Sequence, residues 1–214
     1  MIDPFLIHAA LMMAAWLVLL PAGAAVARFR KVTARQDWPR VVDNQLWWWL
    51  HRILQYGGVA TALAGLAVAW RAAGGLDTGL LHVQAGLVLL ALAGLQIASS
   101  WLRGGKGGPT GAGADPRRPE TWRGDHYDMT LRRRLFERWH KSAGWACILG
   151  APVVVALGLS LYGWPWLWSG LALALVLMQA AAIALLARTS RRIGTYQAIW
   201  GPDPVHPGNR RRQG

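Results

Sequence analysis

Charged residues are missing from long stretches of this chain. Residues 4–27, 78–102 and 142–187 contain no Asp, Glu, Lys or Arg, and residues 46–70 contain one, Arg52. A helix that crosses a bilayer needs about 20 predominantly apolar residues. Three of these stretches have room for one such helix each, and residues 142–187 have room for two. The chain, with 54% hydrophobic residues and 14 Trp, therefore has the composition of a membrane protein.

We predict an all-α integral membrane protein with five transmembrane helices, of which the first four form a core and the fifth packs outside it. The run "YGWPW" (Tyr162–Trp166) supplies the turn between the last two helices. The first helix is expected to be a retained span and not a signal peptide, because no basic residues precede its long apolar run. Residues 1–188 form the expected membrane domain, and residues 189–214 form a basic, flexible tail. The expected spans are residues 5–27, 47–70, 79–102, 138–161 and 165–187.

Positive charges lie almost entirely on one side of this expected bundle. Residues 28–46, residues 103–139 and the tail share that side and, with Arg52, Lys141 and Arg188, contain 22 of the 23 Lys and Arg residues. Arg71 alone lies on the other side. Because loops rich in Lys and Arg stay in the cytoplasm, we expect the N-terminus outside and the C-terminus in the cytoplasm. The net charge of +13 then reflects topology, and nucleic acid is not an expected partner.

Four histidines lie near the starts of the first four expected spans: His8, His51, His82 and His140. Successive spans alternate in direction, so His8 and His82 (the outer pair) share the outer face, and His51 and His140 (the inner pair) share the cytoplasmic face. A polar ring in lipid needs a partner. A single such histidine is explained by a hydrogen bond to a neighbouring helix or by reaching the interface. Four histidines paired by depth are harder to explain in that way.

Two facing imidazoles in a helical bundle are the axial ligands that a haem iron takes. A zinc site needs three or four clustered ligands and a di-iron site needs several carboxylates, whereas the expected spans contain no Asp or Glu. A flat macrocycle between helices also needs small side chains nearby. Gly86 follows His82 by four residues and Gly144 follows His140 by four, although small residues also let membrane helices approach closely. Haem is therefore the favoured cofactor.

Four histidine-bearing segments follow one another along the chain: "HAALM" (His8–Met12), "LHRILQYGG" (Leu50–Gly58), "LHVQAGLVLLALAGLQ" (Leu81–Gln96) and "RWHKSAG" (Arg138–Gly144). Together they resemble the four core helices of the cytochrome b561 family, over about residues 5–162. The resemblance implies a transmembrane electron carrier of the bacterial inner-membrane type with two b-type haems. It implies that His8 and His82 hold one haem and that His51 and His140 hold the other.

The chain differs from the animal and plant members of that family. The sixth helix of those members is not expected here, and Trp47–Trp49 stand where ascorbate users often carry a lysine. These differences favour a membrane quinol or a soluble redox protein as the electron donor over ascorbate. Two histidines per iron leave no open coordination position, which favours electron transfer over oxygen activation.

Charged side chains near the two pairs are candidates for neutralising haem propionates. Arg52 and Lys141 flank the inner pair and Arg71 is the candidate for the outer pair, although each also fits a role as a topology anchor. We therefore expect the two haems to differ in reduction potential.

Two other functions stay open: a haem-containing membrane anchor that relays electrons for a soluble dehydrogenase or reductase, and a haem-free transporter or scaffold. His126, in the 103–139 loop, is expected to be a solvated histidine.

Overall fold

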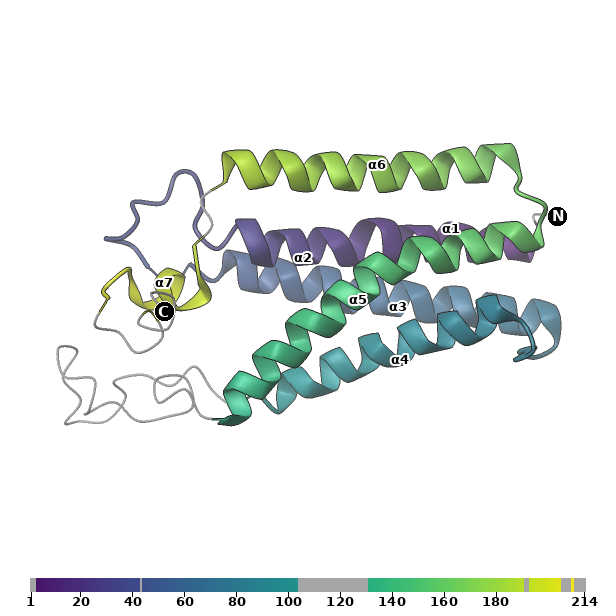
Figure 1. The fold of residues 1–214 in the computed structure, drawn as a ribbon, viewed down its shortest axis with the longest axis horizontal. Coiled ribbons are helices and arrows are strands. Elements are labelled where there is room, and N and C mark those ends of the chain that lie inside the picture. The colour runs from purple at the N-terminus through teal and green to yellow at the C-terminus, as the bar shows by residue number, and fades with distance from the viewer. Residues whose placement is uncertain (1–2, 43, 104–130, 191–192, 205–208, 210–214) are drawn as a thin grey trace.

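The computed structural model describes residues 3–42, 44–103, 131–190, 193–204 and 209. Within these residues the protein is all-helical (Figure 1). His126, most of the 103–139 loop and part of the expected tail lie outside the described residues. The helices are α1 (Pro4–Met13), the π-helix η1 (Ala14–Leu19), α2 (Leu20–Phe29), α3 (Leu46–Ala73), α4 (Leu81–Trp101), α5 (Leu131–Leu161), α6 (Trp166–Thr189) and α7 (Thr195–Trp200).

Five helices are long and apolar enough to cross a membrane, which identifies an integral membrane protein. The first is α1, η1 and α2 together (Pro4–Phe29), and the others are α3, α4, most of α5 (Leu135–Leu161) and α6. The prediction of an all-α fold with five membrane-spanning helices is confirmed. The division into a membrane domain and a flexible tail stays a prediction.

Local sequence explains where several of these helices begin and end. The Asp3 carboxylate caps α1 by accepting a hydrogen bond from the Phe5 backbone N–H at 2.9 Å, a role that Asp fills well. Helix α3 ends at Gly74, whose φ of 71° is a left-handed conformation that glycine adopts without steric cost. Between α5 and α6, Gly163 and Trp164 have φ values of 65° and 58°. This turn lies within the "YGWPW" run, where the sequence predicted one.

The spans form two closely packed pairs. Helix α3 packs along the whole first span, and α5 packs along α4. The two pairs approach each other less closely, although α5 also touches η1 and α3 also touches α4. Helix α6 lies outside this core, against η1, α2 and α5 (Figure 1). The interface between the two pairs is therefore looser than the interface within either pair.

The middle of the first span is a π-helix, which releases backbone carbonyl groups from the regular α-helical ladder. Amide side chains from neighbouring helices bind two carbonyls in this region. Gln55 Nε2 on α3 donates to Leu20 O at 2.9 Å, and Gln179 Nε2 on α6 donates to Leu17 O at 3.3 Å. Because an unpaired carbonyl is costly in apolar surroundings, the bond to Leu17 O stabilises the π-helix. The bond to Leu20 O, the first residue of α2, ties the end of the π-helix to α3.

A short helix that the sequence analysis did not predict, α7, lies at the end of the bundle where α2 ends and α3 begins (Figure 1). The Tyr196 hydroxyl donates a hydrogen bond to Glu137 Oε1 on α5 at 2.9 Å. Trp38 Nε1, from the loop after α2, donates to Gln197 O at 3.3 Å. These two bonds fasten α7 to the bundle. The buried side chains of this segment are those of Ile193, Tyr196, Ala198 and Ile199.

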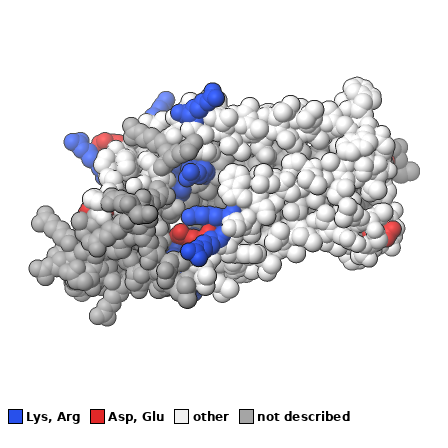
Figure 2. Space-filling view, viewed as in Figure 1, with Lys and Arg blue, Asp and Glu red and all other residues white. Residues whose placement is uncertain are grey.

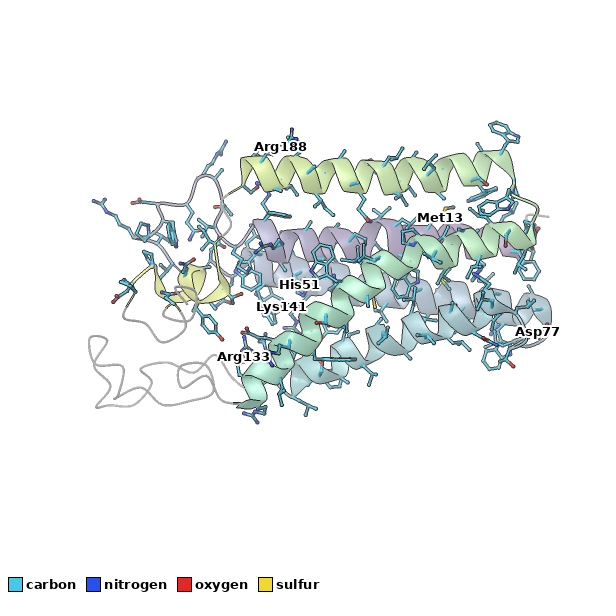
Figure 3. The ribbon with its side chains drawn as sticks, in the orientation of Figure 1. Met13, His51, Asp77, Arg133, Lys141 and Arg188 are labelled. Atoms are coloured by element: carbon cyan, nitrogen blue, oxygen red, sulfur yellow. The ribbon has the colours of Figure 1, made fainter. Side chains whose placement is uncertain are left out.

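Lys and Arg side chains gather at one end of the molecule (Figure 2). Arg133, Lys141 and Arg188 lie at this basic end, and Asp77 lies at the opposite end (Figure 3). Between the two ends, large apolar side chains such as Leu149 are exposed, as expected for a surface that contacts lipid. The charge separation agrees with a cytoplasmic basic end, which stays a prediction.

Candidate functional site

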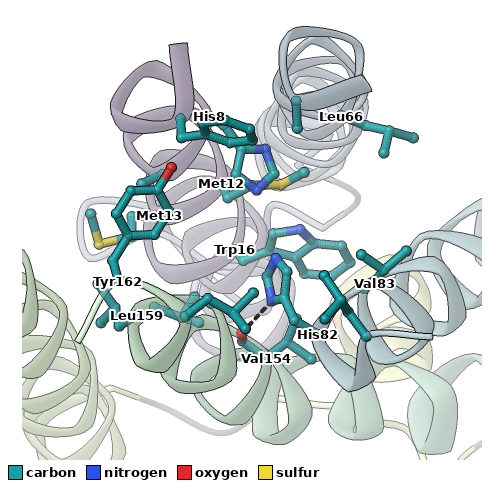
Figure 4. Close-up of a pocket in the computed structure, with 18 of the residues that line it drawn as sticks. His8, Met12, Met13, Trp16, Leu66, His82, Val83, Val154, Leu159 and Tyr162 are labelled. Atoms are coloured by element: carbon teal, nitrogen blue, oxygen red, sulfur yellow. Dashed lines mark hydrogen bonds between the residues drawn. The ribbon is translucent and has the colours of Figure 1, made fainter. Parts of the chain in front are cut away.

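The structure brings the outer pair together at the interface between the two helix pairs. His8 on α1 and His82 on α4 have ring centres 6.1 Å apart and ring planes at 90°. His8 Nδ1 donates to Gly65 O on α3 at 2.9 Å, and His82 Nδ1 donates to Val154 O on α5 at 3.0 Å. Figure 4 shows the His82 ring between Val154 and His8. Each ring is thus anchored within its own helix pair, and its Nε2 stays available to a ligand.

The inner pair has a similar arrangement at the basic end. His51 on α3 and His140 on α5 have ring centres 6.3 Å apart and ring planes at 77°. His51 Nδ1 donates to Gly23 O on α2 at 2.9 Å. His140 differs, because its Nδ1 is buried and has no hydrogen-bond partner among the described residues. Its backbone carbonyl accepts a bond from Gln96 Nε2 on α4 at 2.9 Å.

The spacing of the two pairs fits a metal held between two imidazoles. A metal lies about 2.0 Å from each ligating imidazole nitrogen, and each ring centre lies about 1.1 Å beyond that nitrogen. Two imidazoles on opposite sides of one metal therefore have ring centres about 6 Å apart. The observed separations are 6.1 Å and 6.3 Å. In the described part of the chain, no group of three or more His, Cys, Asp or Glu side chains is placed to hold a metal ion. A pair of histidines suits a haem iron, which takes two axial protein ligands, and does not suit a structural zinc ion, which takes four.

The two pairs lie in separate layers along the bundle. Gly65, which binds the His8 ring, lies 14 residues after His51 on α3. Val154, which binds the His82 ring, lies 14 residues after His140 on α5. At 1.5 Å per residue, each of these distances is about 21 Å. Two independent helices therefore give the same separation between layers.

A cavity of about 410 Å³ surrounds the outer pair. This volume lies in the range of about 300–1,000 Å³ that is usual for cofactor and ligand sites. Most of the lining is apolar (Figure 4). The lining includes both histidines of the outer pair together with Met12, Trp16, Gly86 and Gly158.

Glycines near the histidines have different surroundings. A Cβ on Gly86 would meet only Val154 Cγ1, at 3.9 Å, so Gly86 borders open space in the cavity. A Cβ on Gly158 would lie 2.8 Å from His82 Cε1, so the His82 ring packs directly on the Gly158 backbone. A Cβ on Gly144 would lie 3.2 Å from Gln96 Nε2, which indicates a packing role. The predicted parts of Gly86 and Gly144 in haem binding stay predictions.

Positive charges surround the inner pair. Burial, followed by repulsion from Arg133 and Arg52, lowers the pKa of Arg103, which shows how closely these cations are crowded. The Arg103 guanidinium lies over the Trp48 ring at 4.2 Å. Among the described residues, the cations close enough to act electrostatically on the inner rings include Lys31, Arg103, Arg133 and Lys141.

The structure places the three predicted propionate partners in different surroundings. The Arg52 guanidinium lies over three rings of its own helix, with the Trp49 ring at 5.1 Å, a contact that stabilises a cation. Lys141 Nζ pairs with Glu137 Oε2 at 3.4 Å. Arg71 is exposed at the end of α3 and does not line the cavity of the outer pair. Their roles toward haem stay predictions.

Sequence reasoning missed most of the groups that hold the histidine rings. Three are backbone carbonyl oxygens, which every residue carries, so no sequence signal could have found them. Gly158 gave the weak signal of a small residue in a membrane span. Arg103 was counted as a topology charge, and only the fold brings it near the inner pair.

The chain is similar to a protein that contains a cytochrome b561 domain. It is 26% identical over 157 residues to a cytochrome b561, DM13 and DOMON domain-containing protein from Arabidopsis thaliana. The alignment covers 73% of this chain and 15% of that protein. No protein-family model matches the chain, and no solved structure matches it. Together, this distant similarity and the five apolar helices suggest a membrane haem electron-transfer role.

Proposed function

We propose that this protein carries electrons across a membrane through two b-type haems, one at each histidine pair. The observation that carries the proposal is the presence of two facing imidazole couples, with ring centres 6.1 Å and 6.3 Å apart, in layers about 21 Å apart. In this proposal His8 and His82 hold the outer haem, and His51 and His140 hold the inner haem. Residues 1–188 form the functional membrane domain.

The side chains and carbonyls of this chain would bind, orient and shield the cofactors. When bound, each haem supplies a one-electron redox centre. The carbonyls of Gly65, Gly23 and Val154 orient three of the imidazoles and increase their electron-donating strength. Apolar side chains from both helix pairs exclude water. Two histidines would hold each haem iron and would leave no coordination position open to oxygen, which favours electron transfer.

The positive charges at the basic end support an orientation of the protein in the membrane and a kind of electron donor. We propose that the N-terminus lies outside and that the inner pair lies near the cytoplasmic face of a bacterial inner membrane. The charges at the basic end (Figure 2) agree with positive residues staying inside. The proposed electron donor is a membrane quinol or a soluble redox protein, and lipid contacts the apolar flanks.

The test is the absorption spectrum of the purified protein together with its haem-to-chain ratio. We expect about two haems per chain, because there are two sites with two axial ligands each. His82→Ala and His51→Ala should each lower the ratio to about one, and the double variant should bind none. His206→Ala changes a histidine outside the four and should keep both haems. A wild-type protein that contains no haem when expressed with an adequate haem supply would contradict the proposal.

A second candidate is a haem-containing anchor that relays electrons for a soluble dehydrogenase or reductase. The cationic end favours it, because such a surface suits docking of an acidic protein. Reduction of the purified protein by a quinol analogue, with no other subunit present, would support an autonomous oxidoreductase. Reduction that occurs only after a soluble dehydrogenase is added would support the anchor.

A further inference from the structure

His140 is held differently from the other three histidines. His8, His51 and His82 each donate an Nδ1–H hydrogen bond of 2.9–3.0 Å to a carbonyl of a neighbouring helix. Such a bond fixes the rotation of an imidazole about its last side-chain torsion and selects its tautomer. The buried Nδ1 of His140 has no such partner among the described residues. Another contact must therefore set the plane of this ring.

Phe136 supplies a contact of that kind. It lies four residues before His140 on α5, so the two side chains lie on the same helix face. Their ring centres are 5.1 Å apart and their planes differ by 27°, which is a stacked arrangement. The Phe136 ring is partly buried. A stacked ring restricts rotation of its neighbour, as a hydrogen bond does, because tilting either ring loses the contact.

A charged network also contacts Phe136. The Arg133 guanidinium lies over the Phe136 ring at 5.4 Å, and Arg133 is 6% exposed. Arg133 Nε pairs with Glu137 Oε1 at 3.3 Å, and Glu137 also binds Tyr196 and Lys141. Docking of α7 therefore helps to keep Arg133 over Phe136. The chain of contacts runs from α7 to the His140 ring.

We infer that Phe136 is a positioning residue that sets the ring plane of His140, in place of the carbonyl hydrogen bond that orients each of the other three histidines. The inference rests on the proposed function, because it assigns His140 as an axial ligand. Arg133 acts through Phe136 by packing over its ring. The inner haem therefore has one ligand oriented by stacking and one oriented by a carbonyl, whereas both ligands of the outer haem are oriented by carbonyls.

The test uses the haem-loaded protein with Phe136→Leu, which removes the flat face but keeps an apolar side chain, and Phe136→Tyr, which keeps the face. The electron paramagnetic resonance signal of low-spin ferric haem depends on the angle between the two axial imidazole planes, so it reports ring orientation directly. We expect Phe136→Leu to shift or broaden the signal of one haem and to speed release of that haem roughly two- to tenfold. Phe136→Tyr should keep the wild-type signal and release rate.

Phe29→Leu is the matched control. The Phe29 ring is buried and also lies under an arginine, with Arg28 Cζ at 5.9 Å, but no contact between this ring and a histidine is found in the described residues. It should leave both haem signals unchanged. If Phe136→Leu does not accumulate in the membrane, Phe136→Met replaces it and is judged by the same signals.

The possible results distinguish failure of the proposed function from failure of the inference about Phe136 alone. A wild-type protein without haem would overturn the proposed function and this inference with it. A wild-type protein with two haems, together with a Phe136→Leu variant whose two signals and release rates match the wild type, would overturn the inference alone. Loss of the inner haem from Phe136→Leu, with retention in Phe136→Tyr, would support it.

Discussion

Gly158 leaves the His82 ring no room for an added side chain. Because an added Cβ would lie 2.8 Å from His82 Cε1, Gly158→Ala must move the ring away from its bond with Val154 O or from His8. We expect this variant to bind about one haem per chain in place of about two, with the outer haem lost. The haem-to-chain ratio measured on purified protein checks it.

Gly170→Ala is the control for that change. Gly170 lies within α6, and a Cβ there would meet nothing within 4 Å. The same substitution in another membrane helix should therefore keep both haems. Two haems in Gly158→Ala, with unchanged spectra, would show that the His82 ring can be held in another position.

The π-helix η1 depends on its neighbours for stability. Gln55→Leu removes the hydrogen bond from α3 to Leu20 O, at the junction of η1 and α2, so we expect a loss of about 1 kcal/mol in the free energy of unfolding. Unfolding in a mixed-micelle denaturant titration measures it. The control is Gln45→Leu, because Gln45 is exposed just before α3. Equal stability of the two variants would contradict a supporting role for Gln55.

Docking of α7 depends on the bond between Tyr196 and Glu137. Burial, followed by the charge of Glu137, raises the pKa of Tyr196 to about 12 from its usual 10.0. A raised pKa in the folded state means that the neutral phenol is favoured there. Its contribution to docking is therefore complete below pH 10 and is lost as the pH rises toward 12.

Tyr196→Phe removes this hydrogen bond at every pH. We expect about 1 kcal/mol weaker docking of α7 and faster cleavage of the segment after α6 by an added protease at neutral pH. Tyr162→Phe, at an exposed tyrosine near the opposite end, should leave the cleavage rate unchanged. Equal rates in wild type and Tyr196→Phe would show that other contacts hold α7.

The asymmetric charge of the whole molecule predicts that the two haems have different reduction potentials. The inner pair lies among cations such as Arg103, whereas the described residues that line the outer cavity include Asp77 and no Lys or Arg. Positive charge stabilises the reduced state, so the inner haem should have the higher potential. A redox titration of the wild type should resolve two waves, and a single wave for both haems would contradict this expectation.

Removal of one positive charge near the inner pair identifies which wave of the redox titration belongs to the inner haem. Arg103→Gln should lower the higher potential by roughly tens of millivolts and leave the lower one in place. Arg188→Gln removes a charge at the same end of the molecule but at the exposed end of α6, so it should shift neither wave appreciably. Equal shifts of both waves in Arg103→Gln would mean that this charge is not local to the inner pair.

Hydropathy alone determined that the chain has five helices able to cross a membrane, because the cost of placing charge in lipid applies to each segment separately. Alternation of the spans then assigned His8 and His82 to one depth and His51 and His140 to the other. Only the tertiary structure decided how each ring faces its partner, since helix rotation depends on packing between segments distant in sequence. The same packing brought the carbonyls, Gly158, Phe136 and Arg103 to the histidines, and no local pattern records such contacts.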